Sequence, residues 1–231
     1  MKNKTETFLT QATWLQSTRA ATRDMLATEG QVLMVERRRV LYVSGQPAQS
    51  MFLIGVGRAR LARIDAHGEI VLGFASPGDV IGDEGLVSGS TTYTTKASVV
   101  EDLEALELPV EMVLRACLKD PELPLALARR SLEQRLAIEQ RLSDAVHLSV
   151  AQRLAAFLVQ AAARWGVPHG LGATLVAAPI PHTDIALMIG STRETTSVEI
   201  GLLRSAGVLG PAEHRRLVIL DMKRLKERAR A

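Results

Sequence analysis

Two short segments of helical character meet at Gly190, and this arrangement within residues 183–207 most constrains what the chain can fold into. Apolar side chains recur at helical spacing on both sides of the glycine, so that two helices can pack on one small core: Ile185, Ile189, Ile200 and Leu203. Thr183 and Ser191 are of the types that cap helix N-termini, and Ser191 with Glu194 forms a Ser-x-x-Glu capping box. The pattern predicts a helix-turn-helix, which places its second helix in the DNA major groove.

The geometry of the second helix decides which of its side chains face outward. At about 100° per residue, three positions share one arc and are expected to be buried, namely Thr196, Ile200 and Leu203. The candidate base-reading residues lie on or beside the opposite arc: Arg193, Glu194, Ser197 and Val198. Arg can bond guanine O6 and N7, and Glu can accept from cytosine N4. The alternative is that Glu194 only caps the helix and Arg193 is a solvated charge.

Basic charge is concentrated in the segment that carries these helices. The chain has 231 residues and a net charge of +3. Residues 1–147 hold 17 Lys and Arg against 19 Asp and Glu, whereas residues 148–231 hold 11 against 6. Positive charge on this segment suits attraction to phosphates. Candidate phosphate contacts lie at the two helix starts and in a later basic hairpin: Thr183, Ser191, Thr192, Thr195, Arg215 and Arg216.

Composition argues against several other classes of protein. Aromatic residues make up 3% of the chain, too few for a platform that stacks single-stranded bases. A single cysteine, Cys117, excludes an internal disulfide, and no metal-spaced cluster or catalytic motif is visible. No apolar run reaches 18 residues, and the first residues are not followed by an apolar signal region. We therefore expect a soluble cytoplasmic protein that is not an enzyme and has no membrane partner.

The first half of the chain has β character after a helical start. Residues 1–29 predict one or two short helices, with Phe8, Trp14 and Leu15 as packing points. Seven short β-rich runs then alternate with turns: Gln31–Val35, Arg39–Val43, Met51–Val56, Ala59–Ile64, Ile70–Phe74, Ala97–Val100 and Leu103–Leu108. Asp65-Ala-His-Gly68 is typical of a hairpin, because glycine supplies positive φ. Short strands separated by regular turns predict a barrel or sandwich.

A long amphipathic helix is predicted after a short helix over Pro109–Leu118. Asp120 is expected to cap it, and it should run to about His147. One face is apolar, with Leu125, Leu132, Leu136, Leu142 and Val146 in a stripe that must be buried against something. A second copy of the same helix would make the protein a homodimer, which suits a two-fold DNA site. The alternative is that the stripe packs on the chain's own β domain.

The remaining segments complete a DNA-binding domain. A helix is predicted from Ser149, followed by Trp165-Gly166 and a loop that leads to the helix-turn-helix. Residues 208–220 predict a two-stranded wing, and Asp221 is expected to cap a terminal basic helix.

In this order, the parts resemble the CRP/FNR family of bacterial transcription regulators. Two motifs carry the resemblance: the run from Tyr42 through Asp65-Ala-His-Gly68 to Pro77-Gly-Asp-Val-Ile-Gly82, and Ser191-Thr-Arg193-Glu194-Thr-Thr-Ser197-Val198. The resemblance implies an α+β fold with a helical segment (1–30), a cyclic-nucleotide-binding-like β-roll (31–119), a dimerisation helix (120–147) and a winged helix-turn-helix (148–231). It also implies double-stranded promoter DNA and RNA polymerase as partners.

The sequence departs from the family where cyclic nucleotides bind. Family binders have Gly-Glu and, about ten residues later, an Arg that pairs with the cyclic phosphate. Here the candidate effector pocket consists of Gly82, Asp83, Glu84 and Gly85 with Tyr93, Thr94 and Thr95, and Tyr93 stands in place of the Arg. A phosphate without its cation loses a bidentate, charge-assisted bond. We therefore expect cyclic AMP not to be the effector and predict no cofactor.

The sequence leaves three questions open. The recognition segment has Val198 where the family commonly has a second Arg, so that only an apolar contact is expected there. His67 could ligate haem, but a lone histidine in a turn is more often a solvated side chain. Cys117 could sense redox state, but a lone cysteine in a helix is more often a small buried apolar residue. The alternative function is a small-molecule sensor whose C-terminal module docks a protein rather than DNA.

Overall fold

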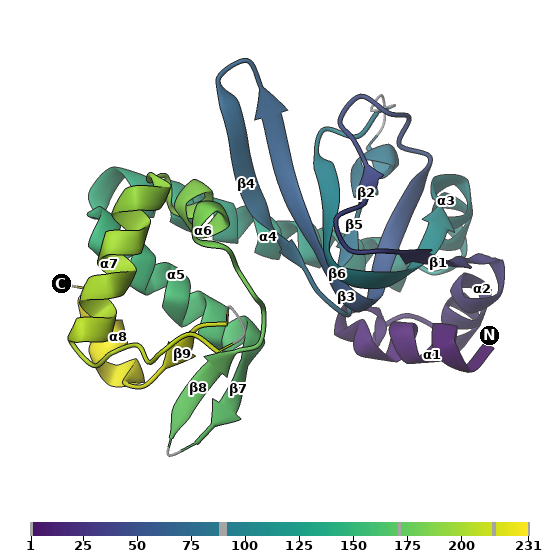
Figure 1. Ribbon diagram of the computed structural model, residues 1–231. Helices are drawn as coiled ribbons and strands as arrows, with labels where there is room; N and C mark the ends of the chain where they lie inside the picture. The colour runs from purple at the N-terminus through teal and green to yellow at the C-terminus, as the bar shows by residue number, and fades with distance from the viewer. Residues whose placement is uncertain (1, 88–91, 171, 214–215, 231) are drawn as a thin grey trace. The chain divides into compact units, whose positions relative to one another are not determined.

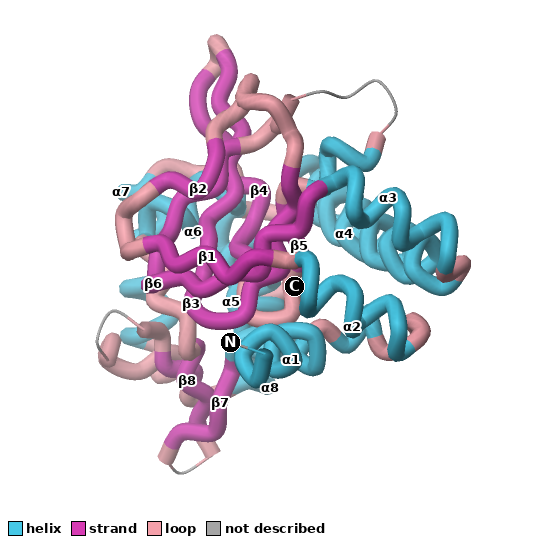
Figure 2. Tube along the Cα trace, turned by 90° about the vertical axis from the view of Figure 1, so that its right-hand side faces the viewer, coloured by secondary structure: helices cyan, strands magenta, loops and turns pink. Residues whose placement is uncertain are grey.

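The computed structural model describes residues 2–87, 92–170, 172–213 and 216–230. The chain divides into two compact units, Met1–Leu136 and Ala137–Ala231, and each is described by itself. Figure 1 labels the elements of both units, and Figure 2 distinguishes their helices from their strands.

The N-terminal unit begins with helices that cover one part of its core. These are α1 (Lys2–Gln11), the 3-10 helix η1 (Thr13–Leu15) and α2 (Ala20–Glu29). The expected packing points are confirmed for Phe8 and Leu15, which are 1% and 0% exposed, and Trp14 is partly buried and donates its indole N–H to the Gly78 carbonyl. The helical start therefore belongs to the same core as the strands.

The sheet of this unit is antiparallel, in the order β1-β6-β3-β4. Its strands are β1 (Gln31–Val35), β2 (Val40–Tyr42), β3 (Ser50–Asp65), β4 (Gly68–Ala75), β5 (Val80–Ile81) and β6 (Lys96–Pro109). β2 pairs with β6, and β5 pairs with β3. Asp65 pairs with Gly68, so the predicted hairpin is confirmed, with Gly68 at φ 130°. The short 3-10 helix η2 (Asp83–Leu86) follows β5.

Two boundaries predicted between strands are wrong. Met51–Val56 and Ala59–Ile64 lie in the single strand β3, and Ala97–Val100 and Leu103–Leu108 lie in β6. Gly57 has φ 78°, and the pairing register of β3 with β6 shifts on both sides of it. A glycine of positive φ forms a bulge that bends a strand without ending it. β5 was not predicted because it has only two residues.

Two helices complete this part of the chain: α3 (Val110–Lys119) and α4 (Glu122–His147), as predicted. The carboxylate of Asp120 accepts from the Glu122 N–H at 3.1 Å, which confirms its capping role. The same carboxylate accepts from Thr22 and from the Arg19 backbone N–H, so it also ties α2 to the start of α4. The apolar stripe of α4 remains exposed in the single chain, by 43% at Leu125, 48% at Leu132, 58% at Leu136, 66% at Leu142 and 71% at Val146.

The C-terminal unit combines helices with a small sheet. Its elements after α4 are α5 (Val150–Trp165), β7 (Gly166–His169), β8 (Ala173–Val176), α6 (His182–Ile189), α7 (Arg193–Ser205), β9 (Val218–Ile219) and α8 (Met222–Arg228). Ser149 caps α5 in a full capping box, and Asp221 caps α8 as predicted. The sheet order is β7-β8-β9.

The segment predicted as a loop needs correction, whereas the predicted wing is present. Gly166–His169 and Ala173–Val176, both expected in the loop, form the antiparallel pair β7–β8. The predicted two-stranded wing is confirmed in its described residues, because Leu209 bridges Ile219 and Glu213 bridges Arg216, both antiparallel. The Gly210 N–H donates to the Val218 carbonyl and the Leu220 N–H to the Val208 carbonyl, each at 2.9 Å. The second strand of the wing includes β9, which also pairs with β8. The sheet therefore takes one strand from beyond the helix-turn-helix and two from before it.

Candidate functional site

The turn between α6 and α7 has the geometry that the sequence predicts. Gly190 ends α6 in the left-handed conformation, at φ 63° and ψ 52°. A left-handed residue after a helix is usually glycine, because any Cβ is strained there. The Ser191 N–H donates to the Ala186 carbonyl at 2.9 Å, so that Ser191 is still tied to the preceding helix. α7 can begin only beyond this residue.

Both helix caps differ from the prediction. Thr192, not Ser191, is the N-cap of α7: its Oγ1 accepts from the Thr195 N–H at 3.1 Å. The Ser191–Glu194 capping box is therefore wrong, because Ser191 is held in the turn. Thr183 is not a cap either, since Pro181 occupies that position and its carbonyl accepts from the N–H groups of Asp184 and Ile185.

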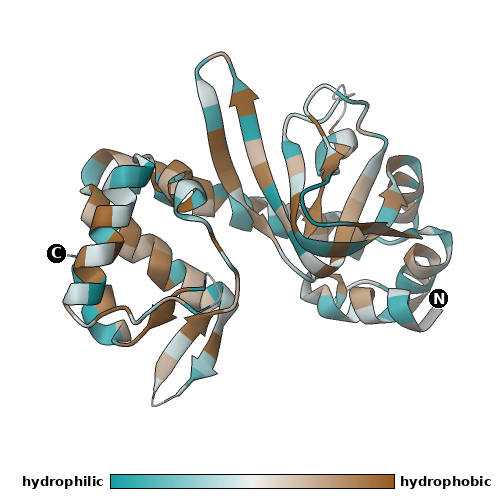
Figure 3. Cartoon of the chain, viewed as in Figure 1, coloured by the Kyte–Doolittle hydropathy of each residue, from teal (hydrophilic) through white to brown (hydrophobic). Residues whose placement is uncertain are grey.

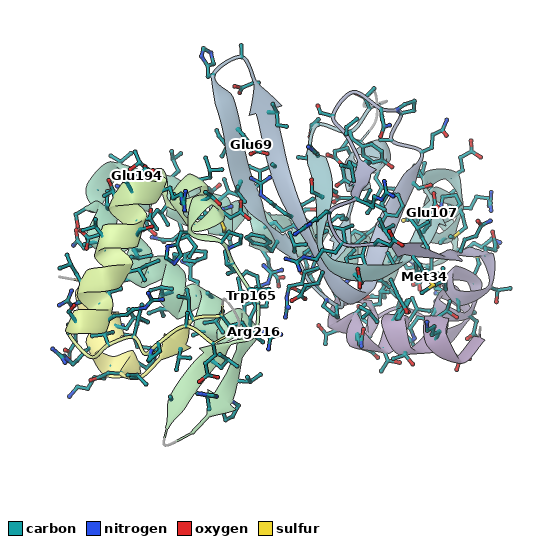
Figure 4. The ribbon with its side chains drawn as sticks, viewed as in Figure 1. Met34, Glu69, Glu107, Trp165, Glu194 and Arg216 are labelled. Atoms are coloured by element: carbon teal, nitrogen blue, oxygen red, sulfur yellow. The ribbon has the colours of Figure 1, made fainter. Side chains whose placement is uncertain are left out.

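The outward arc of α7 is largely as predicted. Thr196 and Ile200 are 0% exposed and Leu203 is 3% exposed, which confirms the buried arc. Arg193, Glu194 and Val198 are exposed, and Val198 reaches 61%. Glu194 lies in the first turn of α7 (Figure 4), and hydrophilic and hydrophobic residues alternate along this helix (Figure 3). Among the described residues, we find no hydrogen bond or ion pair of the Arg193 or Glu194 side chain.

Ser197 has a partner that the sequence did not indicate. The Nδ1 atom of His182, the first residue of α6, lies 3.0 Å from Ser197 Oγ. Burial lowers the pKa of His182, and the positive charges of Arg204 and Arg193 lower it further. Both effects favour the neutral imidazole. No periodic pattern links these two residues, which are 15 positions apart.

Arg153 is a second residue that the sequence analysis missed. Its guanidinium donates to three backbone carbonyls, those of Ile189 at 2.7 Å, Leu148 at 2.6 Å and Gly190 at 3.2 Å. Charge-assisted bonds of this kind are stronger than neutral ones. Arg153 of α5 therefore fixes the end of α6 and the turn that sets the direction of α7.

The candidate phosphate contacts are distributed over the starts of the helices and the segment before β9. Thr183, Thr192 and Thr195 are exposed, and Ser191 and Arg216 are partly buried. Thr192 and Thr195 also share a hydroxyl–hydroxyl bond of 3.0 Å. Arg215 lies outside the described residues, whereas Arg216 forms an isolated bridge with Glu213. Glu213 is in turn bonded to His169 Nε2 at 2.9 Å.

In the N-terminal unit, Tyr93 is built into the core rather than left open to a ligand. It is 5% exposed, and its hydroxyl donates to the Ser50 carbonyl at 2.7 Å. Its ring stacks on Tyr42 at a centroid distance of 4.0 Å, and Tyr42 stacks on Phe52 at 5.9 Å. The position where family binders have a cation is therefore filled by one member of an aromatic stack.

Glu84 takes the hydrogen-bond donors of this region. Its Oε1 accepts from the Thr94 N–H and the Thr94 hydroxyl at 3.1 Å each, and from the Thr95 hydroxyl at 3.2 Å. Gly82 has φ 76°, and a Cβ on Gly85 would lie 2.2 Å from the Ala48 carbonyl oxygen, so both glycines are required by the backbone. The seven candidate pocket residues thus lie in one region, and the Glu84 carboxylate already accepts the hydrogen bonds that Thr94 and Thr95 could otherwise donate to a ligand.

The charge around this region is negative. Burial raises the pKa of Asp83, and the neighbouring Glu84 carboxylate raises it further, while Arg130 of α4 opposes this with the smallest effect. Arg130 itself is paired with Asp79 at 2.9 Å. An incoming anion would therefore meet two acidic groups, and the basic group near them already has a partner.

Other candidate chemistry has little support in the described part of the chain. No cluster of three or more His, Cys, Asp or Glu residues able to hold a metal ion is found there. Cys117 packs against the core, and burial raises the pKa of its thiol. His67 is exposed in the hairpin turn. In the same part of the chain, no helix is both long and apolar enough to cross a membrane.

Two family models match the chain in the order that the resemblance implies. The model of the cyclic nucleotide-binding domain matches residues 32–120, and that of the Crp-like helix-turn-helix domain matches residues 152–228. Together they cover the candidate pocket and the helix-turn-helix.

Curated relatives of the chain are transcription regulators. A global nitrogen regulator of Nostoc sp. is 29% identical over 171 residues, which are 73% of this chain and 76% of the relative. A CRP-like cAMP-activated global transcriptional regulator of Mycobacterium tuberculosis is 26% identical over 196 residues, 84% of this chain and 86% of the relative.

Solved structures share the fold. FixK2 from Bradyrhizobium japonicum superposes with a TM-score of 0.75 at 21% identity, covering 86% of this chain and 96% of the other. A CooA mutant from Carboxydothermus hydrogenoformans gives a TM-score of 0.74 at 24% identity, covering 89% and 90%.

Proposed function

Because the chain belongs to the CRP/FNR family of transcription regulators, we propose that it binds a pseudo-palindromic promoter site as a homodimer and without control by cyclic AMP. The exposed polar arc at the start of α7 carries this proposal. Arg193 and Glu194 have no partner among the described side chains, so that base edges can satisfy them. Arg to guanine and Glu to cytosine are the pairings that these groups favour.

Each half-site would be read by the same few residues. Arg193 and Glu194 read a G·C-containing core, Ser197 bonds a neighbouring edge, and Val198 makes an apolar contact such as one with a thymine methyl. Phosphate contacts fix the register of the protein on the duplex without reading its sequence. The residues proposed to make them are Thr183, Ser191, Thr192, Thr195, Arg215 and Arg216.

The exposed stripe of α4 supports a homodimer. Each side chain of the stripe is at least 43% exposed in the single chain: Leu125, Leu132, Leu136, Leu142 and Val146. Apolar residues repeated along one helix face in this way are typical of a surface covered by another helix. Two copies joined there would present two α7 helices to major grooves one turn apart, roughly 34 Å. RNA polymerase is the further partner that a promoter-bound regulator would contact.

Independence from cyclic AMP is supported by the contacts around Tyr93 and Glu84. A cyclic phosphate in this region would have to displace the Glu84 carboxylate from Thr94 and Thr95, and Tyr93 would offer it no guanidinium in return. It would also be buried beside Asp83. Desolvating an anion without a cationic partner costs several kcal/mol.

The experiment is a binding titration with protein purified free of nucleotide. A duplex selected by the protein from a random pool is titrated at two salt concentrations, with a scrambled duplex as control and with or without cyclic AMP. We expect tight binding of the selected duplex, steep weakening with salt and no change on adding the nucleotide. Weak salt dependence and no preference for the selected duplex would favour a module that docks protein. Binding that appears only with cyclic AMP, or calorimetric binding of the nucleotide at micromolar concentration, would refute the proposed independence.

A further inference from the structure

His182 lies outside the DNA-reading helix but is bonded to one of its outward side chains. It is the first residue of α6, whereas Ser197 lies one turn into α7. The two atoms that meet are His182 Nδ1 and Ser197 Oγ, at 3.0 Å, which is hydrogen-bond distance. Both side chains are partly buried, so the contact stands at the edge of the proposed DNA surface rather than in the core.

We propose that His182 is a positioning residue for DNA recognition, fixing the rotamer and the donor–acceptor sense of the Ser197 hydroxyl. The inference rests on the proposed function and deepens it: a residue of the first helix decides what a residue of the second helix can bond. His182 itself need not contact DNA.

The chemistry follows from the inventory of the two groups. A serine hydroxyl has one proton and two lone pairs, and alone it can bond either kind of base edge. When Nδ1 of His182 is unprotonated, it accepts a hydrogen bond from the Ser197 hydroxyl, and Ser197 offers only lone pairs to DNA. When Nδ1 carries a proton, it donates to Oγ, and the hydroxyl proton is free for an acceptor such as a purine N7 or a phosphate oxygen.

The surroundings of the imidazole favour its neutral form in the free protein. The charged groups that act on it are the guanidinium groups of Arg193 and Arg204, both on α7, and burial adds to their effect in lowering its pKa. A neutral ring can adopt either tautomer, so that Ser197 can serve as acceptor or as donor. A protonated ring permits only the donor arrangement, because both of its nitrogens then carry protons.

The first test is a double-mutant cycle of His182→Ala and Ser197→Ala. The quantity measured is the ratio of affinities for the selected and the scrambled duplex. We expect each single variant to lower this ratio about 2- to 12-fold, the range that one neutral hydrogen bond supports. The double variant should lose no more than Ser197→Ala alone, because without the hydroxyl there is nothing for His182 to orient. Independent, multiplying losses would overturn the proposal.

Two further variants separate positioning from general damage. His182→Asn keeps a polar atom near the place of Nδ1 and should recover part of the discrimination that His182→Ala loses. His67→Ala is the matched control, since His67 is exposed in the hairpin turn between β3 and β4 and should leave the ratio unchanged. If His182→Asn were no better than His182→Ala, the hydrogen bond would not be the operative contact.

A pH series with the unsubstituted protein tests the proposal even if His182→Ala folds poorly. Because the pKa of His182 lies below the ordinary histidine value of about 6.5, the series runs from about pH 8 to about pH 4.5, and protonation at its acid end should change the base preference of the protein at the Ser197 position. The same series with Ser197→Ala should show no such change. An identical pH response in both proteins would refute the inference. If the unsubstituted protein discriminated no duplex at all, the proposed function would fail instead.

Discussion

Replacing Glu194 by alanine should weaken base discrimination while leaving the fold intact. Its carboxylate is exposed in the first turn of α7, and the N-cap of that helix is Thr192. The loss to stability is therefore only the interaction of the carboxylate with the helix dipole, about 0.3–1 kcal/mol. The loss in DNA reading is that of one base contact, about 1–3 kcal/mol. At 25 °C this corresponds to a selected-to-scrambled affinity ratio lower by roughly 5- to 150-fold.

Thr192→Ala is the contrasting variant, because Thr192 Oγ1 holds the Thr195 N–H at 3.1 Å. Loss of such a cap costs about 1 kcal/mol of unfolding free energy, which lowers the melting temperature of a unit of this size by about 4–8 °C. Ser191→Ala removes no cap and should change the unfolding free energy by less than about 0.5 kcal/mol.

The assay is competition anisotropy with the selected and scrambled duplexes, paired with thermal melts of each variant followed by circular dichroism. Glu194→Ala should lower the selected-to-scrambled affinity ratio and hardly change the melting temperature. Thr192→Ala should lower the melting temperature and reduce the affinity for both duplexes alike. Our reasoning would be refuted if Glu194→Ala melted as early as Thr192→Ala and lost the two duplexes equally. Glu194 would then stabilise the helix start rather than read a base.

Three further predictions concern other parts of the chain. Substituting Arg215 and Arg216 together by alanine should lower affinity for all duplexes alike and reduce the slope of log affinity against log salt by about 1 per lost phosphate contact; a loss confined to one base position would contradict it. The double variant Leu132→Asp/Leu142→Asp should sediment as a monomer that binds DNA poorly, and a persisting dimer would mean that the interface lies elsewhere. Asp83→Asn should raise the melting temperature at pH 7, because burial raises the pKa of Asp83 and makes its ionised form costly. This gain should shrink as the pH falls through the raised pKa and should vanish below about 3, where the carboxyl is protonated in both the folded and the unfolded state; a gain independent of pH would refute it.

Local patterns were sufficient for most elements of the fold. The periodicity of the long helix, the capping residue Asp120 and the hairpin glycine Gly68 each act over a few positions, and each prediction is confirmed. Predictions failed where the same residue type is compatible with two local structures. The predicted runs Met51–Val56 and Ala59–Ile64 are separated at Gly57, which forms a bulge within the single strand β3. Ser191 has the chemistry of a cap but is held by the Ala186 carbonyl in the preceding turn.

The contacts that refine the candidate site could not be predicted, because they join residues distant in sequence. His182 meets Ser197 across the helix-turn-helix, and Arg153 reaches carbonyls 36 and 37 positions away. Neither contact leaves a periodic signal. The exposed arc of α7 was predictable, since it depends only on helical geometry and on which residues are apolar.

The contacts of Glu84 explain why the N-terminal unit can be complete without a nucleotide. In a nucleotide-binding site, backbone and hydroxyl donors are left for the ligand, and a cation balances its phosphate. Here Glu84 already occupies the donors of Thr94 and Thr95, and Tyr93 is bonded to Ser50 and stacked on Tyr42. Opening these contacts would leave the hydroxyl of the buried Tyr93 unpaired, at a cost of about 1–3 kcal/mol, whereas the exposed Thr94 donors could bond water. An anion would also arrive beside the Glu84 carboxylate that it had displaced. The same hydrogen bonds, which hold η2 against the residues just before β6, are therefore expected to oppose the binding of cyclic AMP, as the proposed independence from the nucleotide requires.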